Sequence, residues 1–140
     1  MRFMSVRSFL DTNVLIYADD LDSPEKRERA LGLFETACLD GTGVVSTQVL
    51  QEYFVVATRK LGVSASLARR KVELIARLDT VVLGVSDILA ATDLHRLHEL
   101  SFWDALIVRA AQEAGCRVLY SEDLHHGWVL DGLQIVNPFM

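Results

Sequence analysis

Residues 6–17, VRSFLDTNVLIY, hold a short apolar segment that ends at an acidic residue and is followed by a second apolar segment. The first segment, Val6–Leu10, is typical of a buried strand, and it ends at Asp11-Thr12-Asn13. A carboxylate so close to apolar residues is costly unless its charge has a partner. A strand-end Asx turn is one explanation for Asp11, and a binding site is the other.

Outward from this stretch, strands and helices are expected to alternate along the chain. Further strands are expected at residues 44–45, 80–83, 117–120 and 133–136. Helices are expected between the following caps and ends: Ser23 to Gly41, Ser46 to Gly62, Ser64 to Leu78, Ser86 to His98 and Ser101 to Gly115. This alternation predicts an α/β fold with three layers, in which helices cover both faces of a mostly parallel central sheet. Residues 1–140 have the length of one domain.

The composition favours a compact protein of the cytoplasm. Hydrophobic residues make up 51% of the chain and charged residues 24%, which is unlike a disordered chain. No apolar run approaches the roughly 20 residues that cross a bilayer, so no membrane association is expected. The segment before Asp11 lacks the long apolar stretch of a signal peptide. Cys38 and Cys116 are expected to be small buried hydrophobes rather than a disulfide.

The net charge of −5 argues against a protein that holds nucleic acid through its overall field. It does not exclude nucleic acid as a substrate. A nuclease that binds divalent cations carries positive charge at the one place that the phosphate approaches. Clusters of acidic residues are therefore the candidates for a divalent-cation site.

Glu52 and Asp104 lie on expected helices beside apolar neighbours. Glu52 falls at the edge of the apolar stripe that includes Val49 and Val56. Asp104 has Ile107 among its apolar neighbours and occupies the first turn of its helix, where the helix dipole favours negative charge. A surface glutamate and a dipole-stabilised aspartate are the ordinary readings, and a metal ion is the alternative for Asp104.

Asp123 follows the strand that ends at Tyr120, in the sequence Tyr-Ser-Glu-Asp. We take Asp123 as the site residue and expect Glu122 to face solvent, although a loop aspartate that caps the next turn is the ordinary interpretation. Open sheets of this kind bind ligands beyond the carboxyl ends of their strands, so the acids are expected to share one edge. Clustered carboxylates repel one another, and Mg²⁺ or Mn²⁺ would stabilise them. Two such ions about 3.5–4 Å apart can activate water and stabilise the leaving oxygen of a phosphodiester.

Four stretches together resemble PIN domains, and most closely the VapC-type toxins of bacterial toxin–antitoxin pairs. They are FLDTNVLIY (9–17), VSTQVLQEY (45–53), SFWDALI (101–107) and VLYSEDL (118–124), and the resemblance covers essentially the whole chain. Each motif alone is short and degenerate. Four of them in order make a specific signal.

The resemblance implies a PIN-like fold and a Mg²⁺-dependent endoribonuclease that cleaves single-stranded or looped RNA through metal-activated water, without a covalent intermediate. It implies that Asp11, Glu52, Asp104 and Asp123 are the catalytic and metal-binding quartet. Two further polar residues match positions that support the acids in that family: Asn13 and Ser121. The resemblance also implies a homodimer and a small antitoxin that blocks the acidic pocket.

Five basic side chains on the middle helices are candidates to guide RNA: Arg59, Lys60, Arg69, Arg70 and Lys71. Arg59 is the best of them, because it lies two turns beyond Glu52 on nearly the same side of its helix, and Arg69 and Arg70 are weaker. A solvated helix face is the ordinary reading of these residues. Trp103 is expected to be a core or interface residue rather than a base-stacking platform.

Two other functions compete with the nuclease. A phosphatase that forms an aspartyl-phosphate would want a second aspartate two residues after Asp11, and Asn13 stands there instead. A non-catalytic PIN-like binding module is the other rival. Acidic residues at all four matching positions argue against it, because a degenerated site should lose at least one of them.

Overall fold

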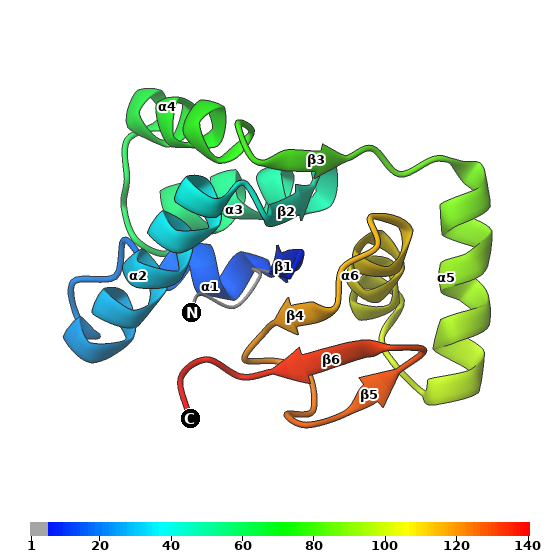
Figure 1. The fold of residues 1–140 in the computed structure, drawn as a ribbon. Coiled ribbons are helices and arrows are strands. Elements are labelled where there is room, and N and C mark those ends of the chain that lie inside the picture. Colours follow the sequence, from blue (N-terminus) through cyan, green and yellow to red (C-terminus); the bar gives the residue numbers. More distant parts are fainter. Residues whose placement is uncertain (1–5) are drawn as a thin grey trace.

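The computed structural model describes residues 6–140; residues 1–5, part of the segment in which no leader is expected, lie outside the described residues. Within residues 6–140, one sheet contains β1 (Ser8–Leu10), β2 (Gly43–Ser46), β3 (Asp79–Val81), β4 (Val118–Tyr120), β5 (Val129–Leu130) and β6 (Leu133–Val136). The strand order is β3-β2-β1-β4-β6-β5 (Figure 1). Every pair is parallel except β5 and β6.

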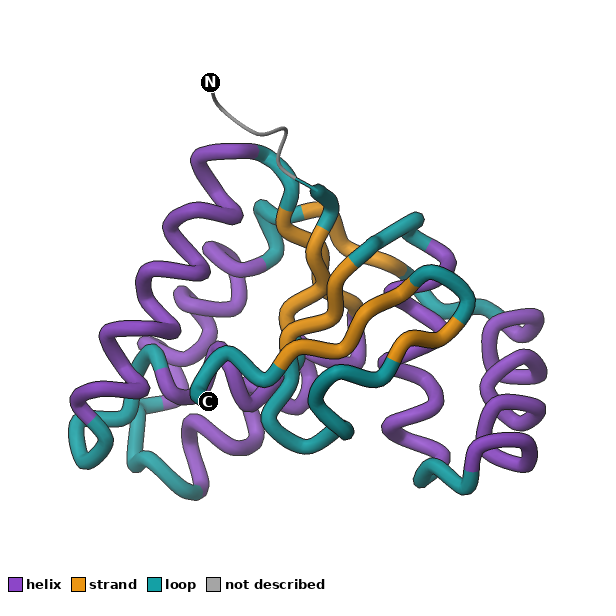
Figure 2. Tube along the Cα trace, turned by 60° about the horizontal axis from the view of Figure 1, so that its bottom comes forward, coloured by secondary structure: helices purple, strands orange, loops and turns teal. Residues whose placement is uncertain are grey.

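Helices lie on both sides of this sheet (Figure 2). They are α1 (Thr12–Tyr17), α2 (Pro24–Asp40), α3 (Thr47–Arg59), α4 (Ala65–Ile75), α5 (Val85–His98) and α6 (Phe102–Glu113). Helix α1 packs on α2 and α3, α3 packs on α4, and α5 packs on α6. The predicted α/β fold with a mostly parallel central sheet between helices is therefore confirmed.

The core follows from the central position of β1. Phe9, Val44, Leu119 and Ile135, from four neighbouring strands, are all fully buried. Strands that are covered on both faces need continuous apolar runs, and this explains why β1, β2 and β4 lack polar alternation. Helix α2 lies so close to β2 that a Cβ on Gly43 would stand 2.6 Å from the Cβ of Ala37 and 3.0 Å from Leu78.

Helix α1 and strand β5 were not predicted from the sequence. The carboxylate of Asp11 accepts a hydrogen bond from the backbone N–H of Thr12 and so caps α1, which is only six residues long. Strand β5 has two residues and joins the sheet as an antiparallel edge. Elements this short do not show the periodic spacing of apolar residues from which helices and strands are predicted.

The start of α5 corrects the expected cap at Ser86. The helix begins at Val85 with Gly84 as its N-cap residue, and the backbone N–H of Gly84 donates to the carboxylate of Asp87 at 2.9 Å. Asp87 also accepts from Arg109 Nε of α6 at 3.0 Å, and this bond ties the two helices together. Helix α4 ends at Ile75 rather than near Leu78.

Cys38 and Cys116 are both free, in agreement with the expectation of no disulfide, but Cys38 is exposed rather than buried. Burial raises the pKa of the Cys116 thiol to about 11. None of the helices in residues 6–140 combines the length and the apolar character needed to cross a bilayer.

Candidate active site

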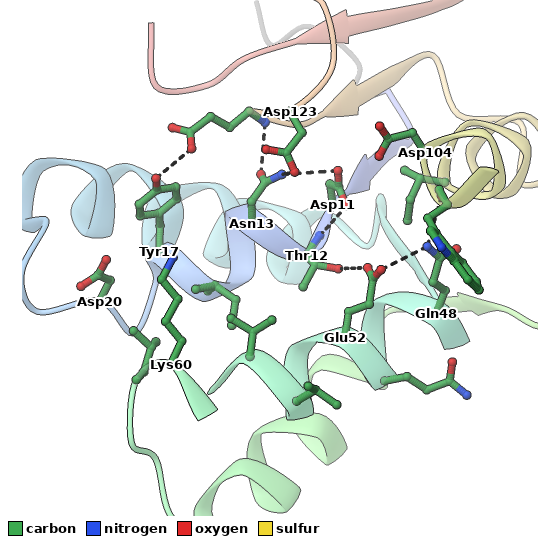
Figure 3. A pocket seen from close by; sticks show the side chains of 18 of the residues that line it. Asp11, Thr12, Asn13, Tyr17, Asp20, Gln48, Glu52, Lys60, Asp104 and Asp123 are labelled. Atoms are coloured by element: carbon green, nitrogen blue, oxygen red, sulfur yellow. Dashed lines mark hydrogen bonds between the residues drawn. The ribbon is translucent and has the colours of Figure 1, made fainter. Parts of the chain in front are cut away.

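The four predicted acids line one pocket, whose volume is about 650 Å³ (Figure 3). Asp11 follows β1, Glu52 lies on α3, Asp104 lies in the first turn of α6, and Asp123 follows β4. Strands β1 and β4 are parallel neighbours, so their carboxyl ends bring Asp11 and Asp123 to the same edge of the sheet. Helices α3 and α6 then place Glu52 and Asp104 at that edge.

Asp11 is the most buried of the four acids, with 5% of its surface exposed. Its carboxylate accepts hydrogen bonds from the N–H of Thr12 at 2.7 Å, from Ser121 Oγ at 2.7 Å and from Asn13 Nδ2 at 3.4 Å. All three donors are neutral. Burial raises the pKa of Asp11 to about 7, and the negative charges of Glu52 and Asp123 act in the same direction.

Asn13 and Ser121 connect the acids to one another. Asn13 Nδ2 lies 3.2 Å from the Asp123 carboxylate, and its Oδ1 accepts from the backbone N–H of Glu122 at 3.1 Å. Ser121 Oγ accepts from the N–H of Asp123 at 3.2 Å while its hydroxyl donates to Asp11. These two side chains therefore lie where the sequence led us to expect supporting polar groups.

Glu52 is held by two neighbours on its own side of the pocket. Its carboxylate accepts from Thr12 Oγ1 at 2.7 Å and from Gln48 Nε2 at 3.3 Å. The Gln48 amide also donates to the backbone oxygen of Trp103 at 3.2 Å, and so links α3 to the start of α6. Thr12 thereby joins the Asp11 turn to Glu52 (Figure 3).

Asp104 is half-buried and stands at the N-terminus of α6, as expected. Its backbone N–H donates to Ser101 Oγ at 3.0 Å, which makes Ser101 the cap of the helix. Burial raises the pKa of the Asp104 carboxyl, and repulsion from Asp123 and Glu52 raises it further, although the bond from Ser101 opposes this. Among the described residues no basic side chain forms an ion pair with Asp104, although the charges of Asp123 and Glu52 act on its carboxyl.

The chemistry of this donor set fits a hard divalent cation. The pocket presents carboxylate oxygens, the preferred ligands of Mg²⁺ and Mn²⁺. The hydrogen-bond partners of the buried Asp11 are neutral, so they do not balance the negative charge that Asp11 carries once it ionises. Among residues 6–140, no three His, Cys, Asp or Glu side chains already meet as a formed metal centre. A cation would therefore require the carboxylates to turn toward one another.

Three residues of the pocket differ from their expected roles. Glu122 does not simply face solvent, because it accepts from the Tyr17 hydroxyl at 2.8 Å and from Lys26 Nζ at 2.6 Å. Of the two roles expected for Trp103, the core is excluded, since 62% of its surface is exposed and it lines the pocket, and the interface role stays a prediction. Thr12 was not selected from the sequence, although its place between Asp11 and Asn13 was a usable signal.

Four of the five basic candidates lie outside the pocket lining. Arg59 is exposed at the end of α3, Arg69 forms an ion pair with Glu73 one turn away, and Arg70 is exposed on α4. The residue next to Arg59, Lys60, lines the pocket instead.

Comparison with known proteins agrees with this architecture. The toxin VapC20 of Mycobacterium tuberculosis, described as cleaving the Sarcin-Ricin loop, is 19% identical and aligns over 83% of this chain and 89% of its own, with a TM-score of 0.69. A chain of a toxin–antitoxin complex from Klebsiella pneumoniae is 19% identical over 94% of this chain and 97% of its own, with a TM-score of 0.69.

A chain of DNA-bound VapBC from Salmonella typhimurium is 21% identical over 94% of this chain and 97% of its own, with a TM-score of 0.64. At this level of identity the likeness shows a shared fold. The comparison with curated proteins finds no match. The family model described as the PIN domain matches residues 8–126, which include all four acids, and the chain therefore belongs to the PIN domain family.

Proposed function

We propose that this protein is a metal-dependent endoribonuclease and the toxin of a toxin–antitoxin pair. In this proposal Asp11, Glu52, Asp104 and Asp123 are the catalytic residues and hold Mg²⁺ or Mn²⁺. The observation that carries it is the burial of Asp11, whose hydrogen-bond partners are all neutral, in a pocket lined by five more carboxylates, among them Glu52, Asp104 and Asp123. None of these partners balances the negative charge of Asp11 when it ionises, and a bound cation would do so.

Each residue has a distinct part in the proposed site. Thr12 donates to Oδ1 of Asp11 and Ser121 donates to Oδ2, so both carboxylate oxygens keep a defined position at the end of β1. Asn13 holds Asp123 near Asp11. A bound divalent cation supplies charge that activates water and stabilises the leaving oxygen of a phosphodiester.

The substrate and partners are proposed from the same evidence. The VapC20 likeness supports RNA as the substrate, and two of the similar structures, described as a toxin–antitoxin complex and as VapBC, support a small antitoxin as partner. Exposed apolar side chains on and around α5, including Val85, Leu89 and Leu97, support a homodimer. Arg59, Arg69 and Arg70 remain predictions for RNA contacts.

Cleavage of RNA by the Asp104→Asn variant tests the proposal. The change keeps the shape of the side chain and removes one carboxylate, so Mg²⁺-dependent cleavage of single-stranded RNA should fall at least about a hundredfold. Asp93→Asn on the exposed surface of α5 is the matched control and should cleave as the unmodified protein does. The circular dichroism spectra of both variants should match that of the unmodified protein, which shows that they are folded. Full cleavage by folded Asp104→Asn protein would remove Asp104 from the site.

A further inference from the structure

One end of the pocket carries a single basic residue. Lys60 is the one Lys or Arg that lines the pocket within residues 6–140, and Figure 3 shows its side chain extending from the end of α3 into the pocket. Tyr17 and Asp20 lie at the same end (Figure 3). The acids Asp11, Glu52, Asp104 and Asp123 line the pocket away from Lys60, and Asp20 is an acid at the Lys60 end. Lys60 is therefore the one basic group, among the described residues, in a lining whose other charged groups are all acidic.

The Lys60 ammonium group has no ion-pair partner among the described residues, unlike two other lysines nearby. Lys26 pairs with Glu122, and Lys71 pairs with Asp19. Glu122, the acid whose carboxyl pKa Lys60 helps to lower, already binds Lys26 and the Tyr17 hydroxyl. Lys60 is thus free to receive an anionic group that enters the pocket.

Apolar side chains form part of the pocket lining around the second half of α3. Lys60, the C-cap residue of α3, follows Glu52 by eight positions, a separation of about 12 Å along the helix axis. The apolar part of the lining includes Ile16, Val55, Val56 and Leu61. An apolar strip with a cation at its far end matches a nucleotide, which presents a flat base and ribose carbons next to a phosphate.

We propose that Lys60 and the apolar strip of Ile16, Val56 and Leu61 form a subsite for the nucleotide next to the bond cut at the acids. Lys60 contacts the phosphate of that nucleotide, and the strip contacts its base or ribose. The inference rests on the proposed nuclease function. The competing role for Lys60 is purely structural, because a lysine at a helix C-terminus is favourable to the helix dipole.

Binding measurements separate these roles. The probe is a ten-nucleotide single-stranded RNA, and its dissociation constant is measured from low to moderate salt in Mg²⁺ with the Asp104→Asn protein, which prevents cutting. Adding Lys60→Gln should weaken binding about tenfold and reduce the slope of log affinity against log salt by about 0.7. Lys60→Arg should keep the slope. Arg96→Gln, which removes an exposed charge on α5, should change neither quantity.

Cleavage of two substrates provides a second readout in the otherwise unmodified protein. Lys60→Gln should lower kcat/KM about tenfold on the ten-nucleotide RNA. It should leave the cleavage of a dinucleoside monophosphate unaffected, because the only phosphate of that substrate is the one that is cut. Equal losses on both substrates with a lowered melting temperature would establish the structural role instead.

The failure of this subsite and the failure of the nuclease proposal give different results. If the unmodified protein cleaves RNA and Lys60→Gln behaves as Arg96→Gln does, the subsite is wrong and the nuclease stands. If no RNA is cleaved but the salt slope still falls with Lys60→Gln, the nuclease is wrong and the phosphate contact stands. Absence of RNA binding by the unmodified protein would overturn both.

Discussion

Ser121 donates a 2.7 Å hydrogen bond to Asp11, although 110 positions separate the two residues in the chain. Both side chains are buried, and each follows one of the neighbouring parallel strands β4 and β1. The bond opposes the rise that burial imposes on the pKa of Asp11. It thus ties the most buried acid of the pocket to the loop that carries Asp123.

Ser121→Ala should destabilise the folded protein, because it removes a donor from a buried carboxyl group. We expect the free energy of unfolding at pH 8 to fall by about 1–3 kcal/mol, as measured by urea denaturation. Ser86→Ala, at an exposed position on α5, is the control and should change it by less than about 0.5 kcal/mol. An unchanged midpoint in Ser121→Ala protein would mean that solvent replaces the lost hydroxyl.

The stability of the metal-free protein should fall as the pH rises toward 7. Burial raises the pKa of Asp11 from 3.8 to about 7, so between these values the folded state holds a proton that the unfolded chain has released. The contribution of Asp11 to the free energy of unfolding is fully present below pH 4 and is lost as the pH rises through 7.

Asp11→Asn cannot ionise, and it should therefore gain stability over the unmodified protein as the pH increases. The difference should reach about 2–4 kcal/mol at pH 8 in the presence of EDTA. Urea denaturation from pH 4 to 8 measures both proteins. If the free energies of unfolding of the two proteins differ by the same amount at every pH, Asp11 does not titrate in this range.

Mn²⁺ should stabilise the protein, because a ligand that binds only the folded state raises its stability. At a hundredfold excess over the dissociation constant the gain is about 2.7 kcal/mol, which a rise in melting temperature reports. Asp104→Asn should need far more Mn²⁺ for the same rise, and EDTA should reverse it. Identical melting curves with and without Mn²⁺ would favour a non-catalytic binding module.

Asp87→Ala tests the cap of α5. Its carboxylate accepts from the Gly84 N–H and from Arg109, so its removal should lower the free energy of unfolding by about 1–3 kcal/mol. Ser86→Ala should have little effect, although the sequence led us to expect the cap there. Thermal denaturation of the two variants side by side makes the comparison. A larger loss in Ser86→Ala would restore the original assignment.

The sheet and most helix ends were predictable because strong local signals agree with the tertiary structure. Pro24 at the first turn and Gly41 at φ 67° define α2 at both ends, and residues 133–136 form β6 as expected. Strand ends and a helix start converge in an open parallel sheet, and this rule directed attention to Asp11, Asp104 and Asp123. Glu52 lies inside α3, and the resemblance to PIN domains was needed to complete the quartet.

Other features depend on contacts that one sequence does not reveal. Ser86 and Asp87 are both good capping residues, and only the position of Arg109 on α6 favours Asp87. Arg59 and Lys60 differ by about 100° around the helix axis, and the sequence ranked Arg59 first although Lys60 is the one that lines the pocket. The exposure of Trp103 likewise depends on how α6 meets α3. Sequence periodicity does not fix such angles.

The strand order also affects when a newly made chain acquires its proposed activity. Strand β1 lies between β2 and β4, so the edge of β1 that pairs with β4 has no hydrogen-bond partner until residues 118–120 have left the ribosome. Ser121 and Asp123 emerge later still, and until then Asp11 lacks its hydroxyl donor and the pocket lacks an acid. A protein that degrades RNA would thereby remain harmless to its own message during most of translation.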